Sequence, residues 1–268
     1  MTEGPGGSRA SVAEGLRFAF GTLTALPVTV ARWDRAAARA GMLGAPLAGL
    51  TVGLCAAALG GLLLAAGSGP VLAAVAGAAT GAVLTRALHL DGLADTADGL
   101  GSGRPPEAAA AVMKRSDIGP FGVVALLLVL AAQIAALARC YAVSWPYGAV
   151  AVALSATTGR LALTLAAREG VRAARPEGLG AAVAETVPAR AAWLALAAVT
   201  AAGAGAGALD GPASIARCGC AVLAGCAAAE ALRRHCGRRL GGVSGDVFGA
   251  LAEAAATAAL VVMTFGTA

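Results

Sequence analysis

Charged side chains are scarce in this sequence. Asp, Glu, Lys and Arg together make up 13% of its 268 residues, whereas hydrophobic residues make up 58%. The mean hydropathy is +0.77. A soluble globular domain carries about 25% charged residues, so this composition excludes that class of protein. The sequence instead predicts an all-α, polytopic transmembrane helical bundle, formed by a single integral-membrane domain over residues 1–268.

Several motifs of soluble enzymes are also missing. There is no P-loop, no dinucleotide-binding fingerprint, no GxSxG and no HExxH, which argues against nucleotide hydrolysis of the usual soluble types. The six cysteines lie within or beside apolar segments and show no paired CxxC spacing. They are therefore expected to be small buried hydrophobes, with no zinc site and no disulfide.

Apolar segments of about 20 residues, the length that crosses a bilayer, can be placed seven times, and six to eight spans fit the sequence. They lie at 42–66, 70–90, 118–138, 147–167, 190–209, 213–232 and 246–265. Residues 12–30 carry Phe18 and Phe20 but also Glu14 and Pro27, which favours a helix in the membrane interface. The spans are rich in Ala and Gly, which let membrane helices approach closely.

Basic residues gather on one side of a seven-span arrangement. Sixteen of the twenty Lys and Arg residues fall there, while the opposite connections near 67–70, 140–146 and 210–212 carry none. Because Lys and Arg near span ends set orientation, the basic side is expected to be cytoplasmic, together with the N-terminus. This topology explains the net charge of +5 without nucleic acid as a partner. The first ten residues lack the features of a signal peptide, so we expect the N-terminus to be retained.

Three aspartates follow the second predicted span directly. Asp91, Asp95 and Asp98 are spaced i, i+4 and i+7, which places them within roughly 60° on one helix face. Each unpaired carboxylate at bilayer depth costs about 2.5–3.5 kcal/mol. A row of hard oxygen ligands suits Mg²⁺, which prefers carboxylates together with substrate phosphate oxygens. The alternative is a solvated helix end, although three like charges on one face repel each other.

A second candidate segment runs from Met113 to Gly122. Lys114, Arg115 and Ser116 precede an expected helix start, where backbone N–H groups can receive a phosphate. The segment serves equally well as a positive-inside anchor in which Asp117 caps the helix.

Further candidates lie within the spans. Asp246 and Glu253 are expected on one face of the last span, and an intramembrane acid suggests function. Capping could explain Asp246 but not Glu253, two turns deeper. Arg160, inside the fourth span, is either a phosphate ligand or the partner of a structural ion pair. His89 is more typical of an interfacial residue than of a ligand or base.

Four motifs together resemble the cobalamin 5'-phosphate synthases, or adenosylcobinamide-GDP ribazoletransferases. They are HLDGLADTADG at 89–99, SDIGPFG at 116–122, GLG at 178–180 and LGGVSGDVFGALAE at 240–253. Two details depart from the family pattern. Arg115-Ser116-Asp117 stands where the family commonly has Asp-Ser-Arg, and Ala25 stands where a basic residue often precedes Leu-Pro.

The resemblance implies a bacterial cytoplasmic (inner) membrane enzyme that joins α-ribazole or its 5'-phosphate to adenosylcobinamide-GDP and releases GMP, with Mg²⁺ as cofactor. It supports Asp91, Asp95, Asp98 and Asp246 as metal ligands, and these acids or Glu253 as the proton acceptor. The expected substrate and phosphate contacts are Lys114, Arg115, Ser116, Arg160, Gly178, Gly180 and Gly245. The partners are these substrates and the lipid bilayer, and a homo-oligomer is compatible with the sequence.

Two other classes remain open. A CDP-alcohol phosphotransferase also has an Asp-rich helix at the membrane edge, but with a DGxxAR pattern, whereas residues 91–96 read DGLADT and place Asp95 directly before the position of that Arg. A cation-coupled transporter would explain intramembrane acids, yet transporter sites lie near the bilayer midplane.

Overall fold

The fold was analysed in a computed structural model that describes residues 9–208 and 211–267. Within these ranges the regular structure is helical, and the only β-type pairings are two isolated bridges. The helices are α1 (Val12–Leu23), α2 (Arg35–Ala65), α3 (Pro70–Leu84), α4 (Leu88–Gly101), α5 (Pro106–Val112), α6 (Pro120–Val143), α7 (Trp145–Ala166), α8 (Gly178–Val183), α9 (Ala189–Gly207), α10 (Pro212–Leu240) and α11 (Gly245–Met263). This confirms the predicted all-α class.

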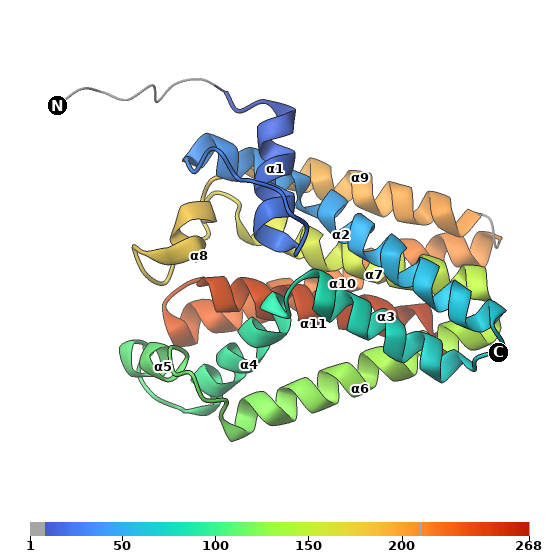
Figure 1. The fold of residues 1–268 in the computed structure, drawn as a ribbon. Coiled ribbons are helices and arrows are strands. Elements are labelled where there is room, and N and C mark those ends of the chain that lie inside the picture. The colour runs from blue at the N-terminus through green and yellow to red at the C-terminus, as the bar shows by residue number, and fades with distance from the viewer. Residues whose placement is uncertain (1–8, 209–210, 268) are drawn as a thin grey trace.

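Six helices are long and apolar enough to cross a membrane, namely α2, α6, α7, α9, α10 and α11. The count rises to seven if the bent pair α3–α4 forms one span, which agrees with the predicted six to eight. Figure 1 shows the long helices running alongside one another, with α1, α4, α5 and α8 gathered at one end. We call this end of the molecule the polar end.

The second predicted span, 70–90, is wrong as a continuous helix. It stops at Leu84, and α4 leaves at 89° to α3. The break occurs at Arg86 and Ala87, which both have a φ of 54°. Such left-handed backbone is uncommon outside glycine, and no Gly or Pro marks the break in the sequence. The turn places α4 crosswise at the polar end (Figure 1).

Helix α1 is shorter than the predicted interfacial helix. It begins with a capping box in which Ser11 and Glu14 each accept a hydrogen bond from the other's backbone N–H. It ends at Leu23, before Pro27, because Thr24 adopts an extended backbone. The expectation of a retained N-terminus concerns residues 1–8, which lie outside the described residues.

Small residues hold the spans together, as predicted. On α2, a Cβ added to Gly49 would meet the Ala156 carbonyl oxygen of α7 at 2.4 Å. A Cβ added to Gly159 on α7 would meet the Ala252 oxygen of α11 at 2.9 Å. Such close backbone approach makes α7 the centre of the bundle, between α2, α10 and α11.

All six cysteines are free. Cys140, Cys218, Cys226 and Cys236 are buried, as predicted, whereas Cys55 and Cys220 are exposed because their faces of α2 and α10 point away from the bundle core.

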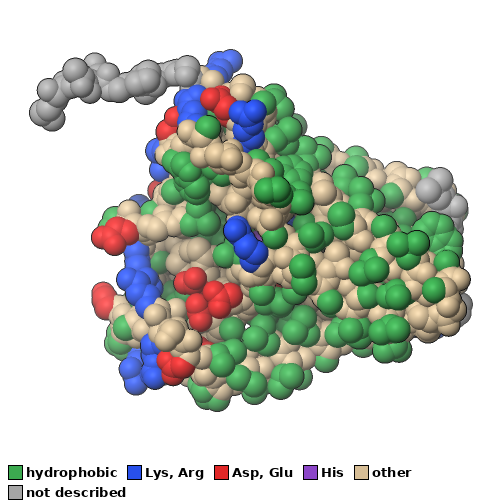
Figure 2. All heavy atoms as spheres, in the orientation of Figure 1, with side chains coloured by type: hydrophobic (Ala, Val, Ile, Leu, Met, Phe, Trp, Pro, Cys, Tyr) green, Lys and Arg blue, Asp and Glu red, His purple; other side chains and the backbone are tan. Residues whose placement is uncertain are grey.

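Charged side chains are concentrated at the polar end. Figure 2 shows basic and acidic groups there, around a hollow that contains acidic side chains, while hydrophobic side chains cover most of the remaining visible surface. The partition matches the uneven distribution of Lys and Arg along the sequence.

Candidate active site at the polar end

The three aspartates of α4 differ in exposure along the helix. Asp91 is exposed, Asp95 is half-buried and Asp98 is buried, with 7% of its surface exposed. Neither Asp91 nor Asp95 accepts a hydrogen bond or forms an ion pair within the described residues. Their carboxylates therefore remain available to a ligand.

Asp98 has a different environment. One carboxylate oxygen accepts a hydrogen bond from the Gly119 N–H at 2.7 Å, and the other accepts from the Gly122 N–H at 2.9 Å. These are backbone N–H groups at the beginning of α6, so Asp98 caps that helix from a neighbouring element. The predicted cap, Asp117, instead pairs with Arg115 at the surface, and Gly119 occupies the N-cap position.

Helix α11 supplies the fourth aspartate. Its N-cap is Ser244, whose hydroxyl accepts a hydrogen bond from the Val247 N–H. Asp246 in the first turn is therefore not the cap, and its carboxylate accepts a 3.3 Å hydrogen bond from the Ser244 hydroxyl. A Cβ added to Gly92 of α4 would lie 2.6 Å from the Asp246 carbonyl oxygen. This glycine lets α4 and α11 bring their acids close together.

A cavity of about 330 Å³ opens between these elements. We call it the acidic cavity, and its polar lining includes His89, Asp91, Arg175, Glu177, Ser244 and Asp246. Gly178, Gly180 and Gly245 also line it. The fold thus brings five predicted site residues from three separate segments into one space. Asp95 lies one turn farther along α4 and is not part of the lining.

Asp95 is nevertheless coupled to this site by its charge. Burial, together with the negative charges of Asp91, Asp246 and Asp98, raises the pKa of Asp95 to about 6. Repulsion among nearby carboxylates is relieved by a bound cation. Within residues 9–208 and 211–267, no three His, Cys, Asp or Glu side chains are arranged to hold a metal ion. Mg²⁺ commonly uses only one or two carboxylates together with substrate phosphates, so the residues fit that mode.

A second cavity of about 500 Å³ adjoins the first, since Arg175 and Ser244 line both. We call it the side cavity. Lys114, a predicted phosphate contact, lines it together with Glu107. Arg115 and Ser116 are exposed and line neither cavity.

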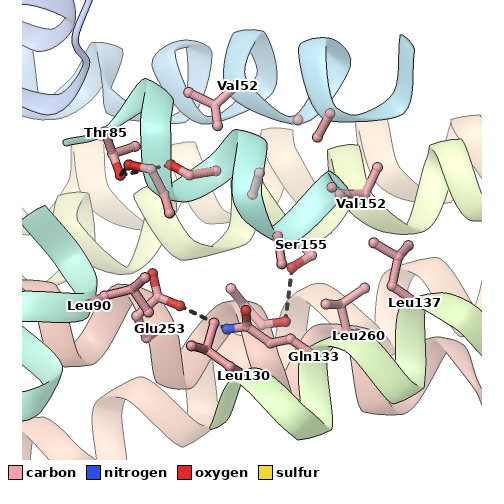
Figure 3. A pocket seen from close by; sticks show the side chains of 18 of the residues that line it. Val52, Thr85, Leu90, Leu130, Gln133, Leu137, Val152, Ser155, Glu253 and Leu260 are labelled. Carbon is pink, nitrogen blue, oxygen red and sulfur yellow. Dashed lines mark hydrogen bonds between the residues drawn. The ribbon is translucent and has the colours of Figure 1, made fainter. Parts of the chain in front are cut away.

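Glu253 lies elsewhere, in a cavity of about 70 Å³ between the spans that we call the intramembrane cavity. Its carboxylate accepts a 2.8 Å hydrogen bond from the Gln133 side chain (Figure 3). The Gln133 side chain also donates a hydrogen bond to the Thr257 hydroxyl. Arg160 lines the same cavity and is buried. The structure therefore separates Glu253 and Arg160 from the acidic cavity.

Three residues near these sites did not emerge as candidates from the sequence. Arg175 stands in a Pro- and Gly-containing loop, and backbone hydrogen bonds from Ala174 to Val243 and from Val243 to Arg172 hold that loop beside α11. Gln133 is one polar residue in an apolar span. His89 is typical of an interfacial residue, and its place at the start of the Asp-rich segment is the one signal in the sequence that points to the site.

The comparisons with known proteins identify a family for this chain. A family model described as cobalamin-5-phosphate synthase matches residues 15–264. An adenosylcobinamide-GDP ribazoletransferase of Frankia casuarinae is 42% identical over 260 residues, covering 92% of this chain and 93% of the relative. The enzyme of that name from a Nocardioides species is 43% identical over 246 residues, covering 91% and 96%. No solved structure gives a significant match.

Proposed function

The chain belongs to the cobalamin-5-phosphate synthase family, and from that membership we propose that it transfers α-ribazole, or its 5'-phosphate, onto adenosylcobinamide-GDP with release of GMP. One observation supports the polar end as the location of the reaction. Asp91 and Asp246, from helices far apart in the sequence, line a single cavity at the polar end.

The proposed reaction is a phosphoryl transfer. A ribazole hydroxyl attacks the phosphorus bonded to the cobinamide arm and forms a new P–O bond. The bond between that phosphorus and the oxygen bridging to GMP breaks, and GMP leaves with the electron pair. The hydroxyl proton passes to Asp91 or Asp95, whose carboxylates have no hydrogen-bond donor within the described residues. Glu253 is a poorer acceptor because it lines a different cavity.

Asp91, Asp95 and Asp246 are the candidates that would hold Mg²⁺, one or two of them at a time together with substrate phosphate oxygens. Asp98 belongs to the predicted ligand set, but its two oxygens already accept backbone hydrogen bonds, so we assign it the role of fixing α4 against α6. When bound, Mg²⁺ would neutralise the negative charge that develops on the phosphate oxygens. The repulsion that raises the pKa of Asp95 supports this assignment.

Basic groups and a helix start would bind the diphosphate. Arg175 lies close enough to Asp246 for electrostatic attraction and lines both polar-end cavities. The start of α11, at Gly245, opens onto the acidic cavity with its backbone N–H groups. Two adjoining cavities suit a reaction with two substrates, and Lys114 would contact the one in the side cavity.

We place the polar end in the bacterial cytoplasm and the spans in the inner membrane. The concentration of Lys and Arg at that end supports this orientation.

The deciding experiment measures GMP release by the purified protein in detergent, supplied with adenosylcobinamide-GDP and α-ribazole 5'-phosphate. We expect GMP and a matching cobalamin product with Mg²⁺ and neither product with excess EDTA. Restoration of turnover by added Mg²⁺ is the control for damage by the chelator. Equal turnover in EDTA would contradict the metal assignment. Absence of product in folded protein would contradict the transfer reaction itself and favour the CDP-alcohol phosphotransferase or cation-coupled transporter alternatives.

A further inference from the structure

His89 connects the acidic cavity to the interior of the bundle. It lies in the first turn of α4, is 2% exposed and lines the acidic cavity. Its Nδ1 atom is 3.4 Å from a guanidinium nitrogen of Arg160 on α7. Arg160 also lines the intramembrane cavity, which contains the Glu253–Gln133 pair. The imidazole therefore stands between a charged group in the bundle and the proposed reaction site.

The contact with Arg160 determines which nitrogen of His89 carries the proton. A guanidinium group has N–H donors and no acceptor. A hydrogen bond between the two side chains therefore requires Nδ1 to be the unprotonated acceptor. In the neutral imidazole the proton then resides on Nε2, which makes Nε2 a donor.

That donor has no partner among the described residues, although Nε2 is buried. Buried polar groups in folded proteins almost always form a hydrogen bond, so an unpaired donor beside a cavity indicates a missing acceptor. The carboxylates of Asp91 and Asp246 line the same cavity but accept no hydrogen bond from it. The acceptor is therefore expected to come from a bound molecule.

We infer that the Nε2–H of His89 binds an oxygen of the substrate diphosphate, and that Arg160 is the positioning residue that fixes this tautomer. The inference rests on the proposed function, because the diphosphate is that of adenosylcobinamide-GDP. Arg175 and the start of α11 line the same cavity and favour an anionic acceptor. In this role His89 donates a hydrogen bond that strengthens as charge develops on the diphosphate oxygens, and it does not accept the hydroxyl proton.

The sequence offers a direct test, because it contains only two histidines. The other, His235, is exposed near the end of α10. In protein labelled with ¹⁵N-histidine, the variant His235→Gln leaves His89 as the sole imidazole signal. We expect the Nε2–H tautomer in the free protein and a shift of the Nε2 and its proton resonances on saturation with adenosylcobinamide-GDP. An Nδ1–H tautomer, or an unmoved signal in saturated protein, overturns the inference.

A binding experiment with inorganic pyrophosphate distinguishes failure of this inference from failure of the proposed function. If the protein neither binds adenosylcobinamide-GDP nor releases GMP, the proposed function fails. A pyrophosphate-induced shift of the Nε2–H signal would then still support an anion-binding His89, and no shift would overturn it. Turnover without any shift of this signal would leave the proposed function intact and overturn the inference alone.

Activity variants provide a second readout. His89→Leu removes the donor, and we expect kcat to fall about 10²- to 10³-fold, as for other single donors to a developing oxyanion. His89→Gln keeps an N–H donor and should retain most of the turnover. Arg160→Met should yield a mixture of His89 tautomers in the ¹⁵N spectrum, whereas Arg160→Lys, which keeps a donor, should restore the single Nε2–H form. Full activity of His89→Leu, or an unchanged tautomer in Arg160→Met, would contradict the assignment.

Discussion

Acidic side chains occur in two regions of this molecule, and their surroundings differ. At the polar end, Asp91 and Asp95 have no hydrogen-bond donor or ion-pair partner within the described residues. In the intramembrane cavity, Glu253 accepts a hydrogen bond from Gln133 and shares its surroundings with Arg160. A carboxylate enclosed by membrane spans is stable only with such partners. A carboxylate at the membrane edge is accessible to water and can stay without a protein partner until a ligand binds.

Asp98 shows that the distinction does not follow sequence position. It belongs to the same Asp-rich segment as Asp91 and Asp95, yet its oxygens are bound by the backbone at the start of α6. We therefore expect Asp98 and Glu253, which have partners in neighbouring helices, to maintain the fold, and Asp91 and Asp95 to carry the proposed chemistry. Four variants test this separation.

The largest effect is expected for Asp95→Ala. Removing a carboxylate that would bind Mg²⁺ forfeits several kcal/mol of charge stabilisation, so GMP release should fall at least about 10³-fold. Membrane insertion should be unchanged. The matched control is Asp117→Ala, since Asp117 is an exposed acid paired only with Arg115. Near-wild-type turnover of the Asp95 variant would contradict the metal assignment.

Gly92→Ala should disturb the geometry of the polar end without removing any charge. The new Cβ would lie 2.6 Å from the Asp246 carbonyl oxygen, so α4 must move away from α11. A displacement near 1 Å between catalytic groups can cost about 10²-fold in rate, and we expect a loss of that order in kcat. Gly81→Ala is the control, because a Cβ there meets nothing within 4 Å. Equal activities of the two variants would show that the α4–α11 contact does not position the acids.

Asp98→Ala should act on stability first. It leaves two backbone N–H groups at the start of α6 without acceptors, each bond being charge-assisted and worth about 1.5–3 kcal/mol. We expect the melting temperature in detergent to fall by on the order of 5–10 °C. Turnover measured well below that temperature should decrease less than in Asp95→Ala. A variant with an unchanged melting temperature and no turnover would show that Asp98 takes part in the reaction.

The smallest effect on turnover is expected for Glu253→Gln. The amide oxygen can still accept the hydrogen bond from Gln133, while the charge that faces Arg160 is lost. Activity should stay within about tenfold of wild type, since a lost partner for a buried charge mainly affects folding. Thermal melting and GMP release are measured together. Abolished turnover at unchanged melting temperature would show that Glu253 takes part in the reaction.

Much of the fold was predictable because apolar length and composition directly determine membrane spans. The six long helices coincide with predicted segments to within several residues. The break between α3 and α4 was not predictable, since Arg86 and Ala87 carry no local turn signal, yet both adopt the left-handed backbone that is uncommon outside glycine. The same holds for the capping of α6, where the cap lies 21 residues before Gly119.

The sequence by itself determined that this chain is a membrane bundle with an Asp-rich segment at one edge, because hydropathy, basic-residue asymmetry and i, i+4 spacing are local properties. Only the tertiary structure decided which acids face a common cavity. Asp91 and Asp246 meet there because α4 turns by 89° and packs against α11 at Gly92. Asp98, Glu253 and His89 acquire their partners from α6 and α7 in the same way, since contacts between distant segments depend on packing rather than on spacing along the chain.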